Sequence, residues 1–359
     1  MFLDQLSIPI IQGPMLGAST EAMVVSVSKA GGLGSLAASN LAPQALSMAM
    51  AKLRVATDRP FAINLFIQAP ADPTMAEVRT AMDLLAPWRE QFGLPAQALP
   101  NQWAEAFLPQ FTALVDAAPP VASFTFGILT PDQVSALQSR GIWVMGTATT
   151  VAEAKAWAAV GADAICAQGF EAGGHRGTFL KDVRESQVGT LSLVSTIREA
   201  VDLPIVAAGG ITDGKAVAAA LAMGAAAAQI GTAYLLADES AISAPWRKAI
   251  ETADDDATRL TRVFSGRYAR GIENRFMREM QAHEAEIPAY PIQNALTQEL
   301  RAATAKAGSA EALSLWAGQS LTLARKGKSD EITHRLWLEA LDAMRDTATR
   351  WLRTPMDTI

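Results

Sequence analysis

Eight short runs of β-branched and small apolar residues recur through the first two thirds of the chain, separated by longer alanine-rich stretches. Strands that alternate with helices and are apolar on both faces are typical of parallel sheets covered on both sides. Eight such strands predict an α/β fold in which the sheet closes into a (β/α)₈ barrel, or TIM barrel. The runs lie at residues 9–12, 34–38, 62–66, 122–126, 143–146, 164–167, 205–208 and 227–230.

The stretches between these runs have the length and composition of helices. Thr130-Pro131 and Thr212-Asp213 provide the capping residues that favour helix starts. A doubly wound open sheet is the structural alternative, but it calls for a G-x-G-x-x-G motif after the first strand, which residues 11–15 do not supply. We therefore expect the barrel, with helices near residues 20–30, 42–53, 131–140, 151–160, 191–200 and 215–223.

Two regions exceed a minimal barrel. Within a barrel domain of residues 1–240, residues 69–120 separate the third and fourth strands and carry Trp88 and Trp103. We expect this segment to form a helical excursion over the barrel mouth. Residues 241–359 form the second predicted domain, a helical cap on the face of the barrel where the strands end. From residue 245 onward we expect it to be helical almost throughout.

Composition excludes several classes of protein. With 50% hydrophobic and 18% charged residues the chain is too apolar for disorder, and a net charge of −6 without a basic stripe argues against nucleic-acid binding. One cysteine, Cys166, excludes an internal disulfide, and three histidines without ligand spacing predict no metal site. The apolar stretches are too short to span a bilayer. Residues 6–15 form a strand-like run without the basic region and small-residue cleavage site of a signal peptide, so we expect no secretory signal. We expect a cytoplasmic protein that binds small molecules and does not bind membranes. Assembly into a homodimer is the oligomeric state that we consider.

Barrel enzymes place their sites where the strands end. Pro14 and Met15 follow the first strand, where they either form an ordinary tight turn or let a flat ligand approach the backbone. Asn64 lies within the third strand and needs hydrogen-bond partners, because an unpaired buried amide costs roughly 1–3 kcal/mol. A polar ligand and a neighbouring backbone are equally good sources of these partners.

The segment after the sixth strand is the most informative one. Gln168 is followed by Gly173, Gly174 and His175, and adjacent glycines let backbone N–H groups face an anion. A lone histidine is usually structural, but a loop rich in glycine at a strand end offers little core for His175 to fill. Its ordinary pKa near 6.5 suits proton abstraction at neutral pH. His175 is thus the predicted base.

Two further loops complete the predicted site. Gly209 and Gly210 follow the seventh strand, and residues 229–232 end the eighth. Loops at these two places form the usual phosphate site of the barrel, and the lack of lysine or arginine favours a phosphate held by backbone amides. From the residues alone, the prediction is a phosphate-bearing ligand and one base.

Together these segments resemble the nitronate monooxygenase family, formerly called 2-nitropropane dioxygenases. The resemblance covers most of the chain, and the Gly-Gly-His-Arg-Gly motif at residues 173–177 is its most specific part. The matching segments are residues 9–15, 30–34, 123–127, 171–177, 208–211, 229–232, 264–267 and 314–319.

The resemblance implies an FMN-dependent barrel that oxidises alkyl nitronates with O₂ to a carbonyl compound and nitrite. It implies that His175 removes the α-proton when a neutral nitroalkane is the substrate, and that Thr125 and Ser265 lie with it at the substrate. The residues implied to bind FMN are Pro14, Met15, Asn64, Gln168, Gly173, Gly174, Gly209, Gly210, Gln229, Ile230, Gly231 and Thr232.

Two other functions stay open. An NAD(P)H-dependent quinone or enoyl reductase on the same fold is the first, although no dinucleotide fingerprint is visible. The second is a flavin- or phosphate-binding protein without catalysis, which the presence of His175 in an intact loop argues against.

Overall fold

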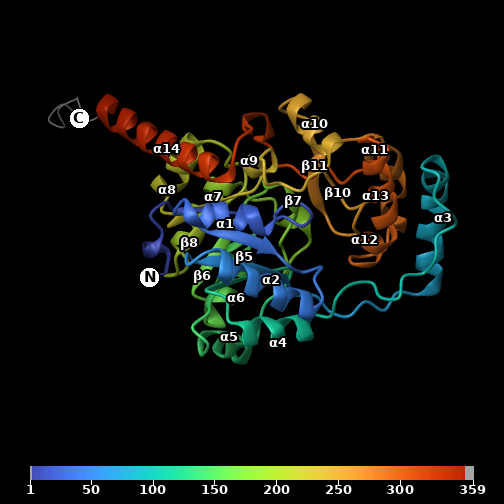
Figure 1. Ribbon diagram of the computed structural model, residues 1–359, viewed down its shortest axis with the longest axis horizontal. Helices are drawn as coiled ribbons and strands as arrows, with labels where there is room; N and C mark the ends of the chain where they lie inside the picture. The colour runs from blue at the N-terminus through green and yellow to red at the C-terminus, as the bar shows by residue number, and fades with distance from the viewer. Residues whose placement is uncertain (1, 352–359) are drawn as a thin grey trace.

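The computed structural model describes residues 2–351, and its centre is a sheet of eight parallel strands (Figure 1). The strand order is β1-β9-β8-β6-β5-β4-β3-β2, and a parallel bridge between Ile11 and Leu33 joins β1 to the start of β2 and closes the ring. All eight predicted strands and the (β/α)₈ barrel are therefore confirmed. The strands are β1 (Ile10–Gln12), β2 (Gly34–Ala37), β3 (Phe61–Phe66), β4 (Val121–Thr125), β5 (Trp143–Ala148), β6 (Ala164–Gln168), β8 (Ile205–Ala208) and β9 (Ala227–Ile230).

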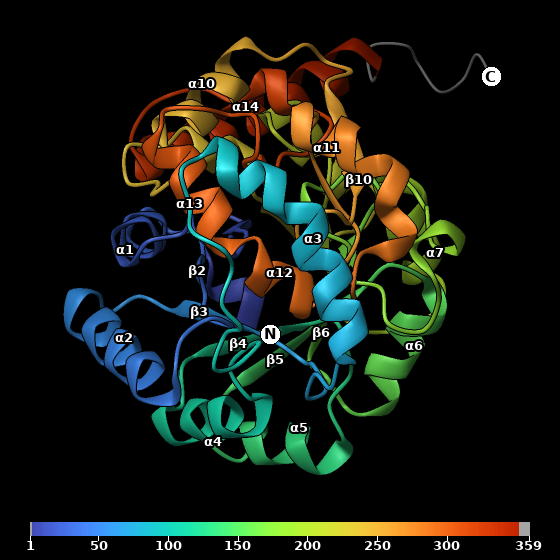
Figure 2. The same cartoon turned by 90° about the vertical axis from the view of Figure 1, so that its right-hand side faces the viewer.

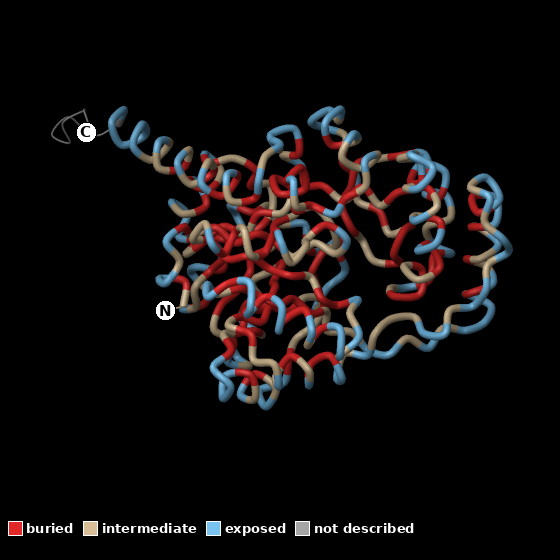
Figure 3. Tube along the Cα trace, viewed as in Figure 1, coloured by how far each residue is buried: buried red, intermediate tan, exposed pale blue. Residues whose placement is uncertain are grey.

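The barrel strands are buried on both faces because their side chains alternate between two apolar clusters. In β6, Ile165 and Ala167 pack outward with the helices, whereas Ala164 and Cys166 belong to the cluster inside the barrel. This alternation follows from the two-residue period of a strand. Figure 3 shows the consequence, a continuous buried trace through the barrel. Small inward residues leave the strand ends open for a ligand.

A ring of helices surrounds the strands (Figures 1 and 2). The predicted caps form: the hydroxyl of Thr130 accepts from the Gln133 N–H, and the carboxylate of Asp213 accepts from the Ala216 N–H. The helices are α1 (Glu21–Lys29), α2 (Pro43–Ala56), α4 (Phe107–Ala117), α5 (Pro131–Gln138), α6 (Val151–Ala159), α7 (Thr190–Arg198), α8 (Gly214–Ala222) and α14 (Ser329–Trp351).

Helix α14 belongs to this ring although it lies far along the sequence. It packs against α8 and α1, and the Tyr234 hydroxyl, just after β9, meets the Thr333 hydroxyl at 2.8 Å. The segment after the eighth strand thus returns to the barrel. The expectation that all residues beyond 240 cap the strand ends is corrected here, because the apolar stripe of α14 is buried against barrel helices.

The cap, defined here as residues 244–320, contains a small antiparallel sheet in the order β10-β11-β7 as well as helices. The expectation of an almost wholly helical segment is wrong at these strands. The third strand comes from the barrel: Gly174 and His175 pair with Arg270 and Ala269. The elements are α10 (Ala244–Thr252), β10 (Thr258–Thr261), β11 (Ala269–Ile272), α11 (Arg275–Met280), α12 (Ile292–Leu296), α13 (Gln298–Lys306) and, from the barrel, β7 (Gly174–His175).

The excursion between β3 and β4 contributes one long helix, α3 (Met75–Gln91), to this second layer. Trp88 on α3 contacts Phe276 of α11 with ring centroids 5.1 Å apart, and Val78 and Leu85 lie in the same buried cluster. Figure 2 shows α3 running alongside the cap helices. The remaining short helices are η1 (Phe2–Gln5), η2 (Val183–Glu185), α9 (Thr232–Leu235), η3 (Gln281–Glu286) and η4 (Leu321–Leu323). Within residues 2–351, no helix combines the length and hydropathy that a bilayer crossing requires.

Candidate active site

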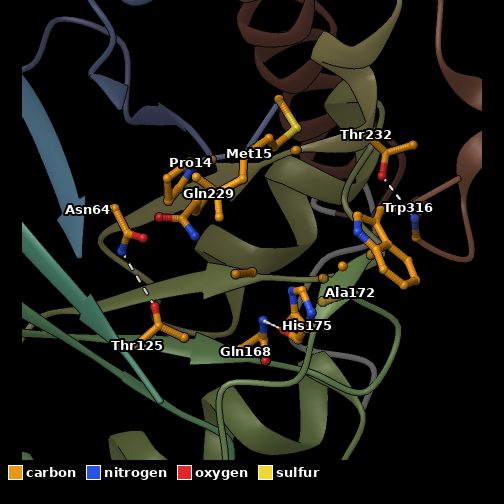
Figure 4. A pocket seen from close by; sticks show the side chains of 18 of the residues that line it. Pro14, Met15, Asn64, Thr125, Gln168, Ala172, His175, Gln229, Thr232 and Trp316 are labelled. Atoms are coloured by element: carbon orange, nitrogen blue, oxygen red, sulfur yellow. Dashed lines mark hydrogen bonds between the residues drawn. The ribbon is translucent and has the colours of Figure 1, made fainter. Parts of the chain in front are cut away.

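A cavity of about 330 Å³ lies between the ends of the barrel strands and the cap (Figure 4). This volume falls in the range of small-molecule and cofactor sites. One wall is built by strand ends and loops of the barrel, and the other by the cap residues Tyr290, Asn294, Arg301 and Trp316. The predicted residues that line it are Pro14, Met15, Asn64, Thr125, Gln168, Gly173, Gly174, His175, Gly209, Gly210, Gln229, Gly231 and Thr232.

Two predicted residues do not line the cavity. The Ile230 side chain belongs to the barrel core, and only its carbonyl group takes part in the local structure, by accepting from the Gly13 N–H at 2.8 Å. The Ser265 side chain is buried behind His175. The strand period explains the first result, because the side chain of Ile230 must point opposite to that of Gln229. Because the Ser265 side chain contacts His175 from behind, it lies against the predicted base and away from the cavity.

Two amide side chains of the barrel wall, Asn64 and Gln229, have hydrogen-bonding groups that are not paired within the described residues. Asn64 Nδ2 donates to the backbone carbonyl and the hydroxyl of Ser123, at 3.2 and 2.9 Å, so a neighbouring strand supplies part of what the sequence required. Among residues 2–351, Asn64 Oδ1 and the side-chain amide of Gln229 have no hydrogen-bond partner. Both residues line the cavity, as Figure 4 shows. These free groups suit a flat ring that carries its own donors and acceptors.

Gln168 organises the loop that carries His175. Its Nε2 donates to the His175 carbonyl at 3.0 Å, and its Oε1 accepts from the Gly177 N–H at 2.7 Å. The buried Arg176 side chain donates to the carbonyl groups of Gln168 and Ser186, both at 3.0 Å. Together with the pairing of β7 to β11, these bonds fix the backbone on which His175 sits. The arginine of the Gly-Gly-His-Arg-Gly motif thus stabilises the loop through hydrogen bonds to its backbone.

The tautomer of His175 is coupled to the hydrogen bonds of Ser265. The Ser265 hydroxyl donates to the Arg267 carbonyl at 3.0 Å and lies 2.8 Å from His175 Nε2. A serine hydroxyl has one hydrogen to donate, so when it donates to the Arg267 carbonyl it accepts at His175. In this arrangement His175 carries its proton on Nε2 and keeps a lone pair on Nδ1. That nitrogen is the atom that can receive a proton from a substrate.

The surroundings of His175 keep its imidazole neutral. Burial, with the nearby positive charges of Arg267 and Arg301, lowers the pKa of His175 from 6.5 to about 3. The expectation of an ordinary pKa is corrected, because desolvation and like charge both disfavour the imidazolium. A neutral histidine can accept a proton at any pH near 7, but it is a weaker base than an ordinary one. His175 is also the one basic acceptor among the side chains that line the cavity in the described part of the chain.

Aromatic rings enclose the imidazole. Phe126, Tyr290 and Trp316 have ring centroids 5.6, 5.7 and 5.5 Å from that of His175, and Phe66 lies 6.4 Å away. Such walls bury apolar groups well and leave few polar contacts. Figure 4 shows Trp316 beside His175. Sequence reasoning assigned these four residues no role; only the resemblance, which includes Phe126 and Trp316, gave a signal for two of them.

Glycines and short polar side chains shape another part of the cavity wall, where the barrel loops meet residues 317–320 of the cap. Gly210 has φ +70°, and its carbonyl accepts from the Ser320 hydroxyl at 2.7 Å. A Cβ on Gly173 would lie 2.5 Å from the Ala317 carbonyl carbon, so the cap can approach only a glycine there. Thr232 accepts from the Gly318 N–H at 3.0 Å and keeps its own hydroxyl proton for another partner. This part of the wall suits an anionic group held by backbone amides, as predicted for a phosphate.

A closed parallel barrel, a ligand cavity at its strand ends and one neutral histidine define the class of (β/α)₈-barrel enzymes that act on a ligand bound at that face. The nitronate monooxygenase family profile matches residues 2–339. A relative named probable nitronate monooxygenase, from Staphylococcus aureus (strain Newman), is 40% identical over 317 residues, which are 88% of this chain and 89% of the relative. The chain belongs to the nitronate monooxygenase family and is an oxidoreductase.

Solved structures agree with this assignment. Nitroalkane oxidase from Streptomyces ansochromogenes has a TM-score of 0.89 and 38% identity, covering 96% of this chain and 99% of that one. FabK from Thermotoga maritima has a TM-score of 0.74 and 27% identity, covering 97% of this chain and 98% of that one. The similarity to the nitroalkane oxidase is the greater of the two and supports a flavin as the cofactor.

Proposed function

We propose that this enzyme uses FMN to oxidise alkyl nitronates with O₂, giving a carbonyl compound and nitrite. The observation that carries the proposal is the position of a neutral His175 in an aromatic cavity at the barrel strand ends. Membership in the nitronate monooxygenase family supports the reaction class. A cytoplasmic location and a homodimer stay predictions.

FMN fits the barrel wall. The loops after β8 and β9, with Gly210 and Gly231, offer backbone amides for its phosphate, and Asn64 and Gln229 have free groups for its ring. When bound there, FMN would supply the redox chemistry by accepting electrons from the nitronate before O₂ reacts. The other predicted residues have the same two kinds of role, with loop residues near the phosphate and strand-end residues near the ring. Gln168 acts mainly through the loop that it holds, because its amide is already bonded.

His175 serves the step that precedes oxidation when the substrate is a neutral nitroalkane. Its Nδ1 accepts the α-proton, while Ser265 keeps the other nitrogen protonated. Because the pKa of His175 is about 3, proton transfer to it is uphill, and preformed nitronate should be the better substrate. Phe66, Phe126, Tyr290 and Trp316 exclude water and favour small alkyl groups.

The test is O₂ consumption and nitrite release by the FMN-loaded protein with ethylnitronate and, in parallel, with nitroethane. We expect both signals with ethylnitronate without NADH, and slower turnover with nitroethane. NADH consumption with a quinone, and no O₂ uptake with nitronate, would instead establish the reductase alternative. Chromatography of the cofactor released by denaturation distinguishes FMN from FAD.

A further inference from the structure

Arg301 brings a positive charge to the cavity from the cap. It lies on α13 and lines the cavity together with Tyr290 and Asn294. Its Nη2 donates to the backbone carbonyl and the Oδ1 of Asn294, at 2.9 and 3.0 Å. Nη1 makes no hydrogen bond with the described residues, and Nε is enclosed without any partner. More than half of the donors of this guanidinium are therefore unused.

In the part of the chain that the structure describes, no acidic side chain balances this charge. Among residues 2–351, no carboxylate lies within ion-pair distance of Arg301, and none lines the cavity. Arg89, by contrast, which also reaches the cap, pairs with Glu299 at 2.7 Å. A desolvated charge without a partner is unfavourable, and burial lowers the pKa of Arg301 to about 10, which leaves it charged at neutral pH. Such a group is stabilised when an anion enters the cavity.

The neighbours of Arg301 limit what that anion can be. The Tyr290 hydroxyl has no partner among the described residues, and its ring packs against His175 and Phe126. Arg301 is also close enough to His175 to act on its charge. A planar guanidinium matches a planar anion with two oxygens, which it can bind through two parallel hydrogen bonds. The apolar walls leave room for a small alkyl group.

We propose that Arg301 is the anion-recognition residue of this site and binds a planar, two-oxygen monoanion of the substrate, with the Tyr290 hydroxyl as a second donor. The inference rests on the proposed function and deepens it, because the nitro group of an alkyl nitronate is such an anion. A carboxylate on a longer nitronate has the same shape and charge. In either case Arg301 selects anionic over neutral substrates.

The first test measures binding without turnover. Isothermal titration calorimetry of the purified holoenzyme with acetate and with nitrate should show saturable binding to the wild type, weakened at least tenfold in Arg301→Met. Arg301→Lys keeps the positive charge but loses the planar pair of donors, and its affinity for acetate and nitrate should be intermediate. Arg345→Met, on the exposed face of α14, is the control for loss of one arginine and should bind as the wild type does. Flavin content and thermal melting of each variant verify that it is folded.

The second test separates the two sources of the anion. If Arg301 binds the nitronate group itself, Arg301→Met raises KM for ethylnitronate about tenfold to a hundredfold, with a smaller change in kcat and in the rate on neutral nitroethane. If it binds a separate carboxylate, the rise is confined to a nitronate that bears one. Either pattern supports the proposal, and equal KM values for Arg301→Met and wild type on both substrates would overturn it.

The proposed function can fail separately. A wild type that binds acetate through Arg301 but does not oxidise nitronates would refute the reaction and keep the anion site. A wild type that oxidises ethylnitronate but binds acetate and nitrate no better than Arg301→Met does would refute the anion site and keep the reaction.

Discussion

The two walls of the cavity are built differently. The barrel wall consists of strand ends and glycine loops, and its polar groups, such as Asn64 and Gln229, are neutral. The cap wall brings aromatic rings and the charged Arg301 from helices and loops far along the sequence. From this difference we propose that the barrel loops would hold the cofactor, and that the cap, together with Phe66 and Phe126 of the barrel, would select the substrate. His175 joins the two walls, because its strand β7 pairs with β11 of the cap.

The largest expected effect, loss of the cofactor and with it turnover of every substrate, tests the barrel wall. Gly210→Asp places a carboxylate at the predicted phosphate position and strains a residue whose φ is +70°. Two like charges about 4 Å apart repel by about 4 kcal/mol at an effective dielectric of about 20, so FMN affinity should fall more than a hundredfold. Gly308→Asp is the matched control, because Gly308 has the same φ of +70° at an exposed position. Absorbance of the purified variants measures bound flavin, and a fully yellow Gly210→Asp would refute the phosphate placement.

The next effect tests the residue between the walls. His175→Asn should keep FMN bound but lower turnover of neutral nitroethane by about 10²–10⁴-fold, because general base catalysis is lost. Activity on ethylnitronate should largely survive, since no proton has to be removed. The wild type should show no acid limb from His175 between about pH 8 and 5, because a pKa of about 3 keeps the imidazole neutral throughout. Equal loss on both substrates would contradict the role of His175 as a base.

A smaller effect tests the tautomer. Ser265→Ala removes the acceptor for His175 Nε2–H and frees the imidazole to place its proton on Nδ1. We expect kcat for nitroethane to fall about tenfold, equivalent to about 1.4 kcal/mol, with KM and ethylnitronate turnover nearly unchanged. Parallel losses on both substrates would show that Ser265 supports the cavity in general. Ser265→Thr, which keeps the hydroxyl, should recover part of the rate.

The smallest effect lies outside both walls. Thr130→Ala removes the N-cap of α5 and should lower the free energy of unfolding by about 1 kcal/mol without changing activity. Thermal denaturation measures the loss, and Thr130→Ser is the control that keeps the capping oxygen. A change in nitronate kinetics here would mean that the outer helices affect the site, against the division between barrel and cap.

The barrel wall could be predicted because its pattern is local. A strand such as β6 shows its two buried faces within five residues, and the glycines after β8 and β9 follow directly on the strands that place them. Once the barrel was inferred, the strand ends had to converge at one face. This reasoning located His175, Asn64 and Gln229 at a common cavity.

The cap wall could not be predicted in the same way. Tyr290 and Arg301 reach the cavity through the tertiary packing of short elements. The sequence pattern of their segments does not indicate that they line a cavity. The low pKa of His175 has the same origin, because it depends on burial and on two arginines distant in sequence. The place of helix α14 in the barrel could not be predicted for a similar reason, since its partners α8 and α1 precede it by about a hundred residues or more.

We propose that nitronate, without a nicotinamide, delivers electrons to a flavin in this cavity. Anaerobic mixing of the yellow holoenzyme with ethylnitronate and, separately, with NADH tests it most directly through the flavin spectrum. We expect rapid loss of the oxidised flavin spectrum with ethylnitronate and no loss with NADH. Bleaching by NADH alone would refute oxidation of nitronate as the activity and make this enzyme a reductase.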